Sequence, residues 1–341
     1  MEKLTIKEIA RMAGVSPTAV SFVINNKSGV SENTRKKVNE VIKRTNFIPN
    51  LNSKRLFFRK SYNISLVIKQ TSSPFSDLFY LEITKGVLEK SKEYGYNIVF
   101  SDIPIVQGNV QLPEIIKQSD ADGIIFFQDT ENVILNNIEN LNIPYVVVDA
   151  HVANADFTFI NADSELSAYT ATKYLIGQGH KDIAFIGSSY IPEYHYQTFT
   201  GFKNALGEVN IPIQSGWIQS QAIDEISAYN CMAKILECGS GSKSTPTAVF
   251  CAGDIFAIAA IRCARDRGFK VPEDISFIGI DDILLSRYIE PSLTTIKIDK
   301  IQMGILAMEL LVKKINGDIV KSVIVESDNI ILRNSVISQQ K

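Results

Sequence analysis

The N-terminal part of the chain places apolar residues at helical spacing in two short stretches joined by a tight turn. In the first stretch Thr5 and Glu8 form a capping box, and Gly14 can adopt the positive φ that ends a helix. In the second, Ser16 can cap a helix that starts at Pro17, where the missing N–H costs nothing. The pattern predicts a helix-turn-helix, whose second helix can enter the major groove of DNA.

The second predicted helix has two different faces. Apolar residues such as Val20 and Val23 can pack against the first helix, which leaves a mixed outer face. A third helix is expected over residues 32–45, capped by Ser31. The outward positions of the second helix are Thr18, Ser21, Phe22 and Asn25.

From residue 62 onward the pattern changes, because short apolar runs bounded by turn residues alternate with helical stretches. This alternation is typical of buried parallel strands joined by crossover helices. About 280 residues of it exceed what one sheet usually supports, so we expect two α/β subdomains. The predicted strands lie at 64–68, 97–100, 123–127, 145–148, 183–186, 248–252 and 276–280. The predicted helices lie at 78–94, 166–178, 222–236 and 255–267.

Residues 50–60, between these two regions, combine basic and apolar side chains. The segment is too short to form a stable helix in water by itself. We therefore expect it to become ordered only when it binds a partner.

Charge is distributed unevenly along the chain. Residues 1–60 contain 13 of the 35 Lys and Arg but only 4 of the 37 Asp and Glu, which leaves 22 basic and 33 acidic residues in the remainder. The formal net charge of −2 therefore hides a basic N-terminal region on an acidic body. Because the basic region coincides with a helix-turn-helix, it indicates a nucleic-acid partner rather than a merely solvated helical bundle.

The composition also bears on where the protein works. No run of 18 apolar residues is present, so no membrane-spanning helix is expected. Met1-Glu2-Lys3 is followed directly by the capping box, which leaves no room for a signal peptide, and we expect a cytoplasmic protein. The four cysteines form no Cys-x-x-Cys pair, which favours reduced, buried thiols.

Several short motifs, each present once, follow one another in a specific order along essentially the whole chain. In the N-terminal region they are Ile6–Ser16, Ala19–Asn25 and Ile48–Asn50. Each motif is weak alone, but in this order and spacing they make the chain resemble the LacI/GalR family of bacterial transcription regulators. The motifs of the body are Asp122–Ile125, Gly179–Lys181, Thr247–Phe250, Gly279–Asp282 and Pro291–Ile296.

The resemblance implies an all-α helix-turn-helix headpiece plus an α/β periplasmic-binding-protein-like core of two parallel-sheet subdomains. We expect the headpiece at residues 1–49, a hinge linker at 50–61 and the core at 62–341. The chain would cross between the subdomains near Asn161–Asp163, Glu290–Pro291 and Val325–Ser327. Subdomain 1 would comprise residues 62–161 and 292–325, and subdomain 2 residues 162–291 and 326–338.

The same resemblance implies a transcriptional repressor that is controlled by a small-molecule effector, without a cofactor or a metal. The effector would occupy the cleft between the subdomains and set their angle. That angle would decide whether the two headpieces of a homodimer reach a pseudopalindromic operator together. Only Ile337–Lys341 follows the last predicted strand, too short for a stable coiled coil, so we expect a dimer rather than a tetramer.

By resemblance, Pro17, Thr18 and Phe22 at the start and middle of the second helix would read the bases. Phe22 replaces a commoner arginine or histidine, so it can offer only apolar contact, for instance to a thymine methyl group. The alternative is that Phe22 packs inside the headpiece. Other residues expected to contact DNA, chiefly the phosphates, are Thr5, Ser16, Ser21, Asn25, Ser31, Thr34, Asn50, Ser53 and Lys54.

Leu56 falls where family members insert a leucine from the hinge into the minor groove. An apolar wedge at that place unstacks a base step and kinks the duplex. Leu56 as an ordinary packing residue of the linker is the alternative. Phe57 and Phe58 replace a usually smaller and more polar pair.

In the core, Asp149 and Asp281 end apolar strands, and strand C-termini are where α/β sheets place ligands. By resemblance these two carboxylates would line opposite walls of the effector cleft. Alternatively, either could cap the loop that follows, an interpretation we prefer for Asp282, and Asp254 is expected to cap the helix after it. The other residues assigned to the effector site are Phe75, Phe127, Tyr194 and Thr198.

Two positions depart from the family pattern in the cleft. Thr198 stands where many members carry an arginine, and Gly253 stands where many carry an asparagine. Both changes remove polar side chains that usually grip the ligand. The two changes therefore argue against the common sugar or purine effectors of the family. The expected effector is at most sugar-like in a pocket that departs from the usual one, either with fewer polar groups or with contacts from Tyr190, Tyr194, His195 or Tyr196.

Two other classes of function compete with this interpretation. A transport receptor without DNA binding is disfavoured by the basic headpiece, and an enzyme on a dinucleotide-binding fold is disfavoured because no Gly-x-Gly-x-x-Gly follows the first strand. The three histidines lie in no nucleophile or metal motif. Gly239–Thr245 superficially suggests a phosphate loop, but it lacks the Gly-Lys-Ser/Thr order and precedes a strand.

Overall fold

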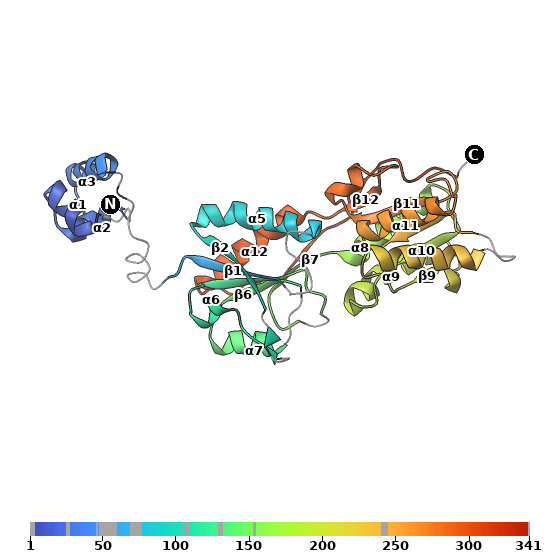
Figure 1. Cartoon of the computed structure of the whole chain (residues 1–341), viewed down its shortest axis with the longest axis horizontal. Helices are drawn as coiled ribbons and strands as arrows, with labels where there is room; N and C mark the ends of the chain where they lie inside the picture. The colour runs from blue at the N-terminus through green and yellow to red at the C-terminus, as the bar shows by residue number, and fades with distance from the viewer. Residues whose placement is uncertain are drawn as a thin grey trace. The chain divides into compact units, whose positions relative to one another are not determined.

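The computed structural model divides by its internal contacts into two compact units, Met1–Tyr62 and Asn63–Lys341 (Figure 1). We refer to them as the headpiece unit and the core. The structure describes residues 4–24, 28–45, 47, 60–68, 77–103, 105–106, 109–128, 132–152, 155–239 and 245–339.

The headpiece is a bundle of three short helices whose ends follow the predicted caps. Both hydrogen bonds of the capping box between Thr5 and Glu8 are present, and Gly14 closes the first helix with a φ of 63°. Ser16 Oγ accepts the amide of Ala19 at 3.1 Å. These helices are α1 (Ile6–Ala13), α2 (Pro17–Ile24) and α3 (Glu32–Thr45).

One small apolar core holds the three helices together. Ile9 of α1, Val20 of α2 and Val38 of α3 are fully buried against one another. The headpiece therefore carries its own core and owes its shape to residues that are close in the sequence.

Subdomain 1 of the core is built on a parallel sheet with the strand order β13-β7-β6-β5-β1-β2 (Figure 1). Its strands are β1 (Asn63–Ile68), β2 (Asn97–Asp102), β5 (Gly123–Phe127), β6 (Tyr145–Val148), β7 (Phe159–Ala162) and β13 (Val323–Val325). Its helices are α5 (Leu78–Tyr94), α6 (Glu114–Lys117), α7 (Asn132–Asn140) and α12 (Lys300–Ile315), and a small hairpin pairs β3 (Ile105–Val106) with β4 (Asn109–Val110).

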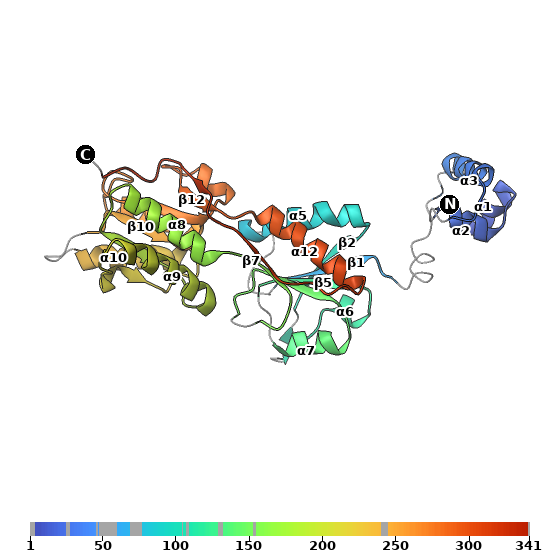
Figure 2. The same cartoon turned by 180° about the vertical axis from the view of Figure 1, so that it is seen from behind.

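Subdomain 2, seen from behind in Figure 2, repeats the design with the order β14-β12-β11-β10-β8-β9, and in this sheet β14 runs antiparallel to β12. Its strands are β8 (Ile183–Ile186), β9 (Ile218–Gln219), β10 (Ala248–Cys251), β11 (Ser276–Asp281), β12 (Thr294–Lys297) and β14 (Ile330–Ile331). Its helices are α8 (Ser164–Gly177), α9 (Pro192–Glu208), α10 (Glu225–Gly239) and α11 (Asp254–Asp266), with one-turn helices η1 (Ser215–Trp217) and η2 (Leu284–Arg287).

The chain passes between the two sheets three times. It leaves β7 for α8 at Asp163, and it leaves β13 for β14 over residues 326–329. The crossing expected at Glu290–Pro291 is wrong, because β12 pairs with β11 through Ile278 and Thr294 and so still belongs to subdomain 2. The turn before β12 is internal to that subdomain, and the crossing follows β12 at residues 298–299.

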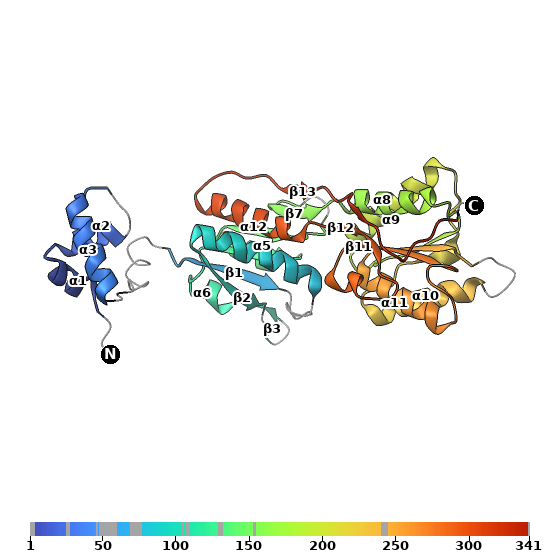
Figure 3. The same ribbon diagram turned by 90° about the horizontal axis from the view of Figure 1, so that it is seen from above.

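Helices α5 and α12 lie side by side in subdomain 1, as Figures 1 and 3 show. Gly86 and Gly304 face the backbone of the opposite helix so closely that a β-carbon on either would collide with the carbonyl of Ile301 or Ile83. The absence of side chains at these two positions lets the helices meet backbone to backbone, which makes them one rigid pair.

Two further features of the core complete the fold. No helix in the described part of the chain is both long and apolar enough to cross a membrane. Cys231, Cys251 and Cys263 are buried as free thiols, whereas the free thiol of Cys238 is exposed.

Candidate DNA-contacting surface and effector cleft

The N-terminal turn of α2 presents an open polar surface. Pro17 and Thr18 are exposed, and Ser16 directs its Oγ onto the amide of Ala19 as an N-cap. Side chains at this end of a helix that follows a tight turn are placed to reach base edges in the major groove. The cap fixes where α2 begins and therefore which residues occupy those positions.

Phe22 lies farther along α2 and is half-buried. Its ring lies over the loop before α3, where a β-carbon on Gly29 would be 3.4 Å from the nearest ring carbon. Gly29 has a φ of 103°, in the region that favours glycine. Phe22 therefore packs partly on its own headpiece and leaves only part of its ring for another molecule.

The start of α3 adds further polar groups. Ser31 Oγ accepts the amide of Thr34 at 3.2 Å, and the two hydroxyls are 2.9 Å apart. Thr5 is exposed and Ser21 half-buried, so the predicted phosphate contacts in this part of the headpiece lie at helix starts or on partly open faces. The predictions for Asn25, Asn50, Ser53, Lys54, Leu56 and Phe75 lie outside the described residues.

On the subdomain 1 side of the predicted effector cleft, Asp149 follows β6 with a φ of 63°. Its Oδ2 accepts the hydroxyl of Tyr80 at 2.5 Å, and its Oδ1 lies 3.2 Å from Nε2 of His151. Burial raises the pKa of Asp149, but the charge and hydrogen bond of His151 and the bond from Tyr80 outweigh it and lower the pKa overall. Asp149 is therefore held as a carboxylate with both oxygens engaged.

On the subdomain 2 side, Asp281 ends β11 with a φ of 120° and is half-buried. Burial raises the pKa of Asp281 well above its usual value, and the nearby carboxyl groups of Asp254 and Asp149 act in the same direction. The ammonium group of Lys300 opposes them. The charges of Asp149 and Asp281 are thus felt across the cleft, although the two residues belong to different sheets.

Tyr194 of α9 connects the two sides. Its ring centroid lies 5.1 Å from that of His151, and its hydroxyl donates to the carbonyl of Ala252 at 3.2 Å. Burial, followed by the charges of Asp281 and Asp149, raises the pKa of Tyr194 well above its usual value, so the phenol stays neutral. The contact between Tyr194 and His151 is made between residues of different subdomains.

Two residues assigned to the effector site lie beneath its surface. Thr198 is fully buried and donates its hydroxyl to the carbonyl of Tyr194 at 2.9 Å, so it does not face the cleft. Phe127 is 3% exposed and stacks under Tyr80 at 5.1 Å between ring centroids. The role expected for Thr198 is wrong in this conformation, because its hydroxyl is used within its own helix, and Phe127 supports Tyr80 rather than forming a wall itself.

The two predicted caps after these strands are also wrong. Asp254 makes no cap on α11; instead its carboxylate accepts Ser286 Oγ at 2.6 Å and Thr295 Oγ1 at 2.5 Å. Asp282 forms ion pairs with Arg333 and Arg287. Both carboxylates therefore anchor the segment after β11. Ser286, Thr295 and Arg333 are distant in the sequence from the aspartates they contact, whereas Arg287 lies in the segment directly after Asp282.

Three residues that contact Asp149 or Asp281 were not identified from the sequence: Tyr80, His151 and Lys300. The sequence around Tyr80 predicts only that this residue belongs to a helix. Lys300 follows β12, a strand that the hydrophobic pattern did not predict. His151 offered a signal, because it stands two residues after a predicted cleft carboxylate.

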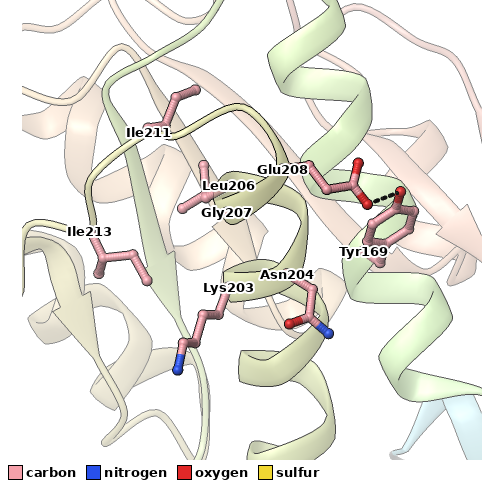
Figure 4. Close-up of a pocket in the computed structure, with 8 residues that line it drawn as sticks. All are labelled: Tyr169, Lys203, Asn204, Leu206, Gly207, Glu208, Ile211 and Ile213. Atoms are coloured by element: carbon pink, nitrogen blue, oxygen red, sulfur yellow. Dashed lines mark hydrogen bonds between the residues drawn. The ribbon is translucent and has the colours of Figure 1, made fainter.

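A separate surface pocket on subdomain 2 lies beside α9, away from the cleft (Figure 4). Glu208 at its edge accepts the hydroxyl of Tyr169 at 2.8 Å and pairs with Lys173 at 2.7 Å, so its charge is already balanced. None of the cleft residues named above lines it. The residues that do are Tyr169, Lys203, Asn204, Leu206, Gly207, Glu208, Ile211 and Ile213.

A helix-turn-helix unit joined to a core of two linked α/β subdomains defines a ligand-responsive DNA-binding regulator. Residues 5–50 match the model of bacterial regulatory proteins of the lacI family, and residues 172–336 match the periplasmic binding protein-like domain. The chain belongs to the LacI family. It is therefore a DNA-binding transcription regulator and not an enzyme.

Known proteins resemble the chain over nearly its full length. It is 35% identical over 323 residues to the HTH-type transcriptional repressor PurR of Histophilus somni (strain 129Pt), covering 92% of both chains. It is 33% identical over 328 residues to the catabolite control protein A of Priestia megaterium, covering 95% of this chain and 96% of that protein. The lac repressor dimer bound to operator and the anti-inducer ONPF has the same fold, with a TM-score of 0.80, 22% identity and coverage of 98% and 100%.

Proposed function

We propose that the chain is a homodimeric, cytoplasmic repressor that binds a pseudopalindromic operator and responds to a small effector in the cleft of its core. The observation that carries this proposal is the convergence of Asp149 and Asp281. Each ends a strand of a different sheet, and Tyr194 and His151 meet between the two sheets. A ligand that binds both walls must favour one relative orientation of the subdomains over others.

The headpiece supplies the DNA contacts in this proposal. Pro17 and Thr18 read base edges, the exposed part of the Phe22 ring gives an apolar contact, and Ser31 and Thr34 approach phosphates. Leu56 of the hinge linker acts as the minor-groove wedge. The excess of 13 basic over 4 acidic residues in the first 60 supports a large electrostatic share of the affinity.

The dimer contact is proposed on subdomain 2. Leu284, Leu285 and Tyr288 in and after η2 are 50%, 44% and 77% exposed, and Ile255 at the start of α11 is 38% exposed. Asp254 binds the amide of Ile283, so the starts of α11 and η2 lie together. A cluster of large apolar side chains in one exposed place supports burial against a second copy.

The effector is proposed to be small and sugar-like, held by a set of contacts that differs from the usual one. A β-carbon on Gly253 would lie 3.9 Å from Oδ2 of Asp281, so the missing side chain would have stood beside that carboxylate. With Gly253 bare and Thr198 buried, Asp281, Asp149 and Tyr194 remain to contact the ligand. We therefore expect a hydrogen-bond donor on the ligand to face Asp281.

Selection of DNA from a random pool by the purified protein tests the DNA part of the proposal. The expected product is a pseudopalindrome with a flexible central step for the two Leu56 wedges. Light scattering of the same preparation at micromolar concentration should give the mass of a dimer. An asymmetric selected site, or a tetramer, would contradict the proposed assembly.

A further inference from the structure

Lys300 is an almost completely buried lysine at the first position of α12, immediately after the crossing that follows β12. Its side chain is 2% exposed. The ammonium group donates to the carbonyl of Asp281 and lies 3.3 Å from a carboxylate oxygen of Glu82. The carbonyls of Asp282 and Ile298 are each 3.4 Å away. A buried ammonium group is retained at a cost unless it is paired, and here its partners come from both subdomains.

The two aspartates that Lys300 contacts have an unusual backbone. Asp281 has a φ of 120° and Asp282 a φ of 50°, both in the region that disfavours L-residues other than glycine. Such conformations persist only where the surroundings over-determine them. The ammonium group attracts the carbonyl oxygens of both residues, and this attraction stabilises their backbone conformation.

Lys300 itself belongs to subdomain 1. It begins α12, which is locked to α5 by the contact at Gly86 and Gly304, and Glu82 of α5 lies beside its ammonium group. Asp281 and Asp282 end a strand of subdomain 2. The hydrogen bond from Lys300 to Asp281 therefore joins the rigid helix pair of one subdomain to the effector-facing strand of the other.

We propose that Lys300 is a positioning residue that sets the Asp281 backbone and couples it to the relative orientation of the two subdomains. A movement that separates the α5–α12 pair from the end of β11 breaks this contact and releases the Asp281 conformation. Conversely, a ligand that holds Asp281 in place stabilises the contact. The importance of Asp281 to a ligand rests on the proposed function, whereas the coupling of Lys300 to the subdomain orientation does not.

The test measures the distance between the subdomains in the full-length protein without any ligand. Spin labels are attached to the exposed Cys238 of subdomain 2 and to an Asn137→Cys substitution on exposed α7 of subdomain 1. Labelled protein is diluted with unlabelled protein so that distances within one chain dominate. The distances are recorded by pulsed electron paramagnetic resonance for the wild type, Lys300→Met, Glu82→Gln and the control Lys297→Met, which removes an exposed lysine three residues earlier.

We expect the wild type and Lys297→Met to share one distance distribution, and Lys300→Met to shift or broaden it. Glu82→Gln, which leaves the lysine but removes its anchor on α5, should give a smaller change in the same direction. Hydrogen exchange of the Ile283 amide, which is bonded to Asp254 at 3.0 Å, should accelerate by about tenfold in Lys300→Met.

A distance distribution for Lys300→Met identical to that of Lys297→Met would overturn the proposal, even if Lys300→Met unfolds at a lower temperature. Loss of stability alone would show a packing role and not a coupling role. Failure of the wild type to select an operator would contradict the proposed function, but it would leave this comparison of distances intact.

Discussion

The headpiece and the cleft are built in opposite ways. Every contact that shapes the described headpiece joins residues within one stretch of about forty positions, and caps such as Thr5 with Glu8 are three residues apart. In the cleft, Tyr80 reaches Asp149 and Lys300 reaches Glu82, over separations of 69 and more than 200 residues. The headpiece can therefore fold as a local unit, whereas the cleft exists only when both sheets are formed and correctly oriented.

The largest effect is expected from a substitution that unfolds the headpiece and leaves the core folded. Val20→Asp places a charge in the fully buried centre of a bundle that has few other apolar contacts, at a cost of about 3 kcal/mol or more. Operator affinity should fall by on the order of 10³-fold, to the level of non-specific DNA. The thermal transition of the core, followed by calorimetry, should not move. As the matched control, Asn39→Asp, at an exposed position of α3 beyond the proposed phosphate contacts Ser31 and Thr34, should keep operator binding within a few fold.

A second prediction concerns the hinge linker. Leu56→Ala should weaken operator binding by about tenfold or more, because without the apolar wedge the cost of a few kcal/mol for unstacking a base step is no longer offset, and the contacts made by the bent DNA are lost. Non-specific binding and its dependence on salt should stay nearly unchanged, since no charge is lost. Fluorescence anisotropy with selected and random duplexes at several salt concentrations measures both. Unchanged operator affinity would mean that Leu56 is an ordinary packing residue.

The reverse experiment disturbs the cleft and spares the headpiece. Asp281→Asn keeps the side-chain shape and removes the negative charge that a donor group of the bound effector would stabilise on Asp281, and a hydrogen bond to a charged group is worth roughly 1.5–3 kcal/mol. Effector affinity should drop by about tenfold, since ~1.4 kcal/mol is a factor of ten. Binding to the operator without effector should barely change.

Titration calorimetry with a ligand found by thermal-shift screening decides this point. Equal affinities for the wild type and Asp281→Asn would show that Asp281 has a structural role only. An operator affinity that falls together with the effector affinity would show instead that the cleft and the headpiece are not separable.

The smallest effect concerns the dependence of core stability on pH. His180 is buried between Thr247 and the carbonyl of Ile337, each at 3.0 Å, and burial lowers its pKa. His180 binds a proton more readily in the unfolded chain than in the folded protein. Its contribution to the free energy of unfolding is therefore fully present above the unfolded pKa of histidine, about 6.5, and declines as the pH falls below that value. His180→Gln should reduce the loss of melting temperature between pH 7.5 and pH 5.5, by the equivalent of about 1 kcal/mol or less.

A calorimetric scan of the wild type and His180→Gln at both pH values tests this prediction. His195 also has a pKa lowered by burial, but it is present in both proteins and cancels in the comparison. An identical pH dependence in the two proteins would contradict it.

The sequence predicted the elements that depend on local signals. Helix α3 and strands β5, β6 and β8 have the predicted bounds, because caps and apolar runs act over a few residues. The sequence also led us to expect Asp149 and Asp281 at strand ends, where the structure has them. It did not predict β12, a strand of four residues whose place is set by pairing with β11. It did not predict α12 either, although this helix of 16 residues has an apolar face that buries Met303, Ala307 and Leu311.

The partners of the cleft carboxylates were missed for the same physical reason. No residue near Asp254 in the sequence indicates that the hydroxyl groups of Ser286 and Thr295 donate to its carboxylate. The sequence around Asp254 therefore predicted only a helix cap. Thr198 was assigned to the effector site only by resemblance, and its hydroxyl is bonded within its own helix. The caps predicted within the headpiece and the bounds of α3 were confirmed, whereas the cap predicted for Asp254 was wrong, because its carboxylate is taken by partners from distant parts of the chain.

The three crossings have a consequence for how the core can be divided. Each subdomain is assembled from separated stretches of the gene, so no continuous fragment encodes either one. A protease that nicks one crossing leaves the two halves tied by the remaining two, and the cut protein stays a single particle. Opening and closing of the cleft is therefore restricted to a bending of three short tethers, with no route by which one lobe can swing free of the other.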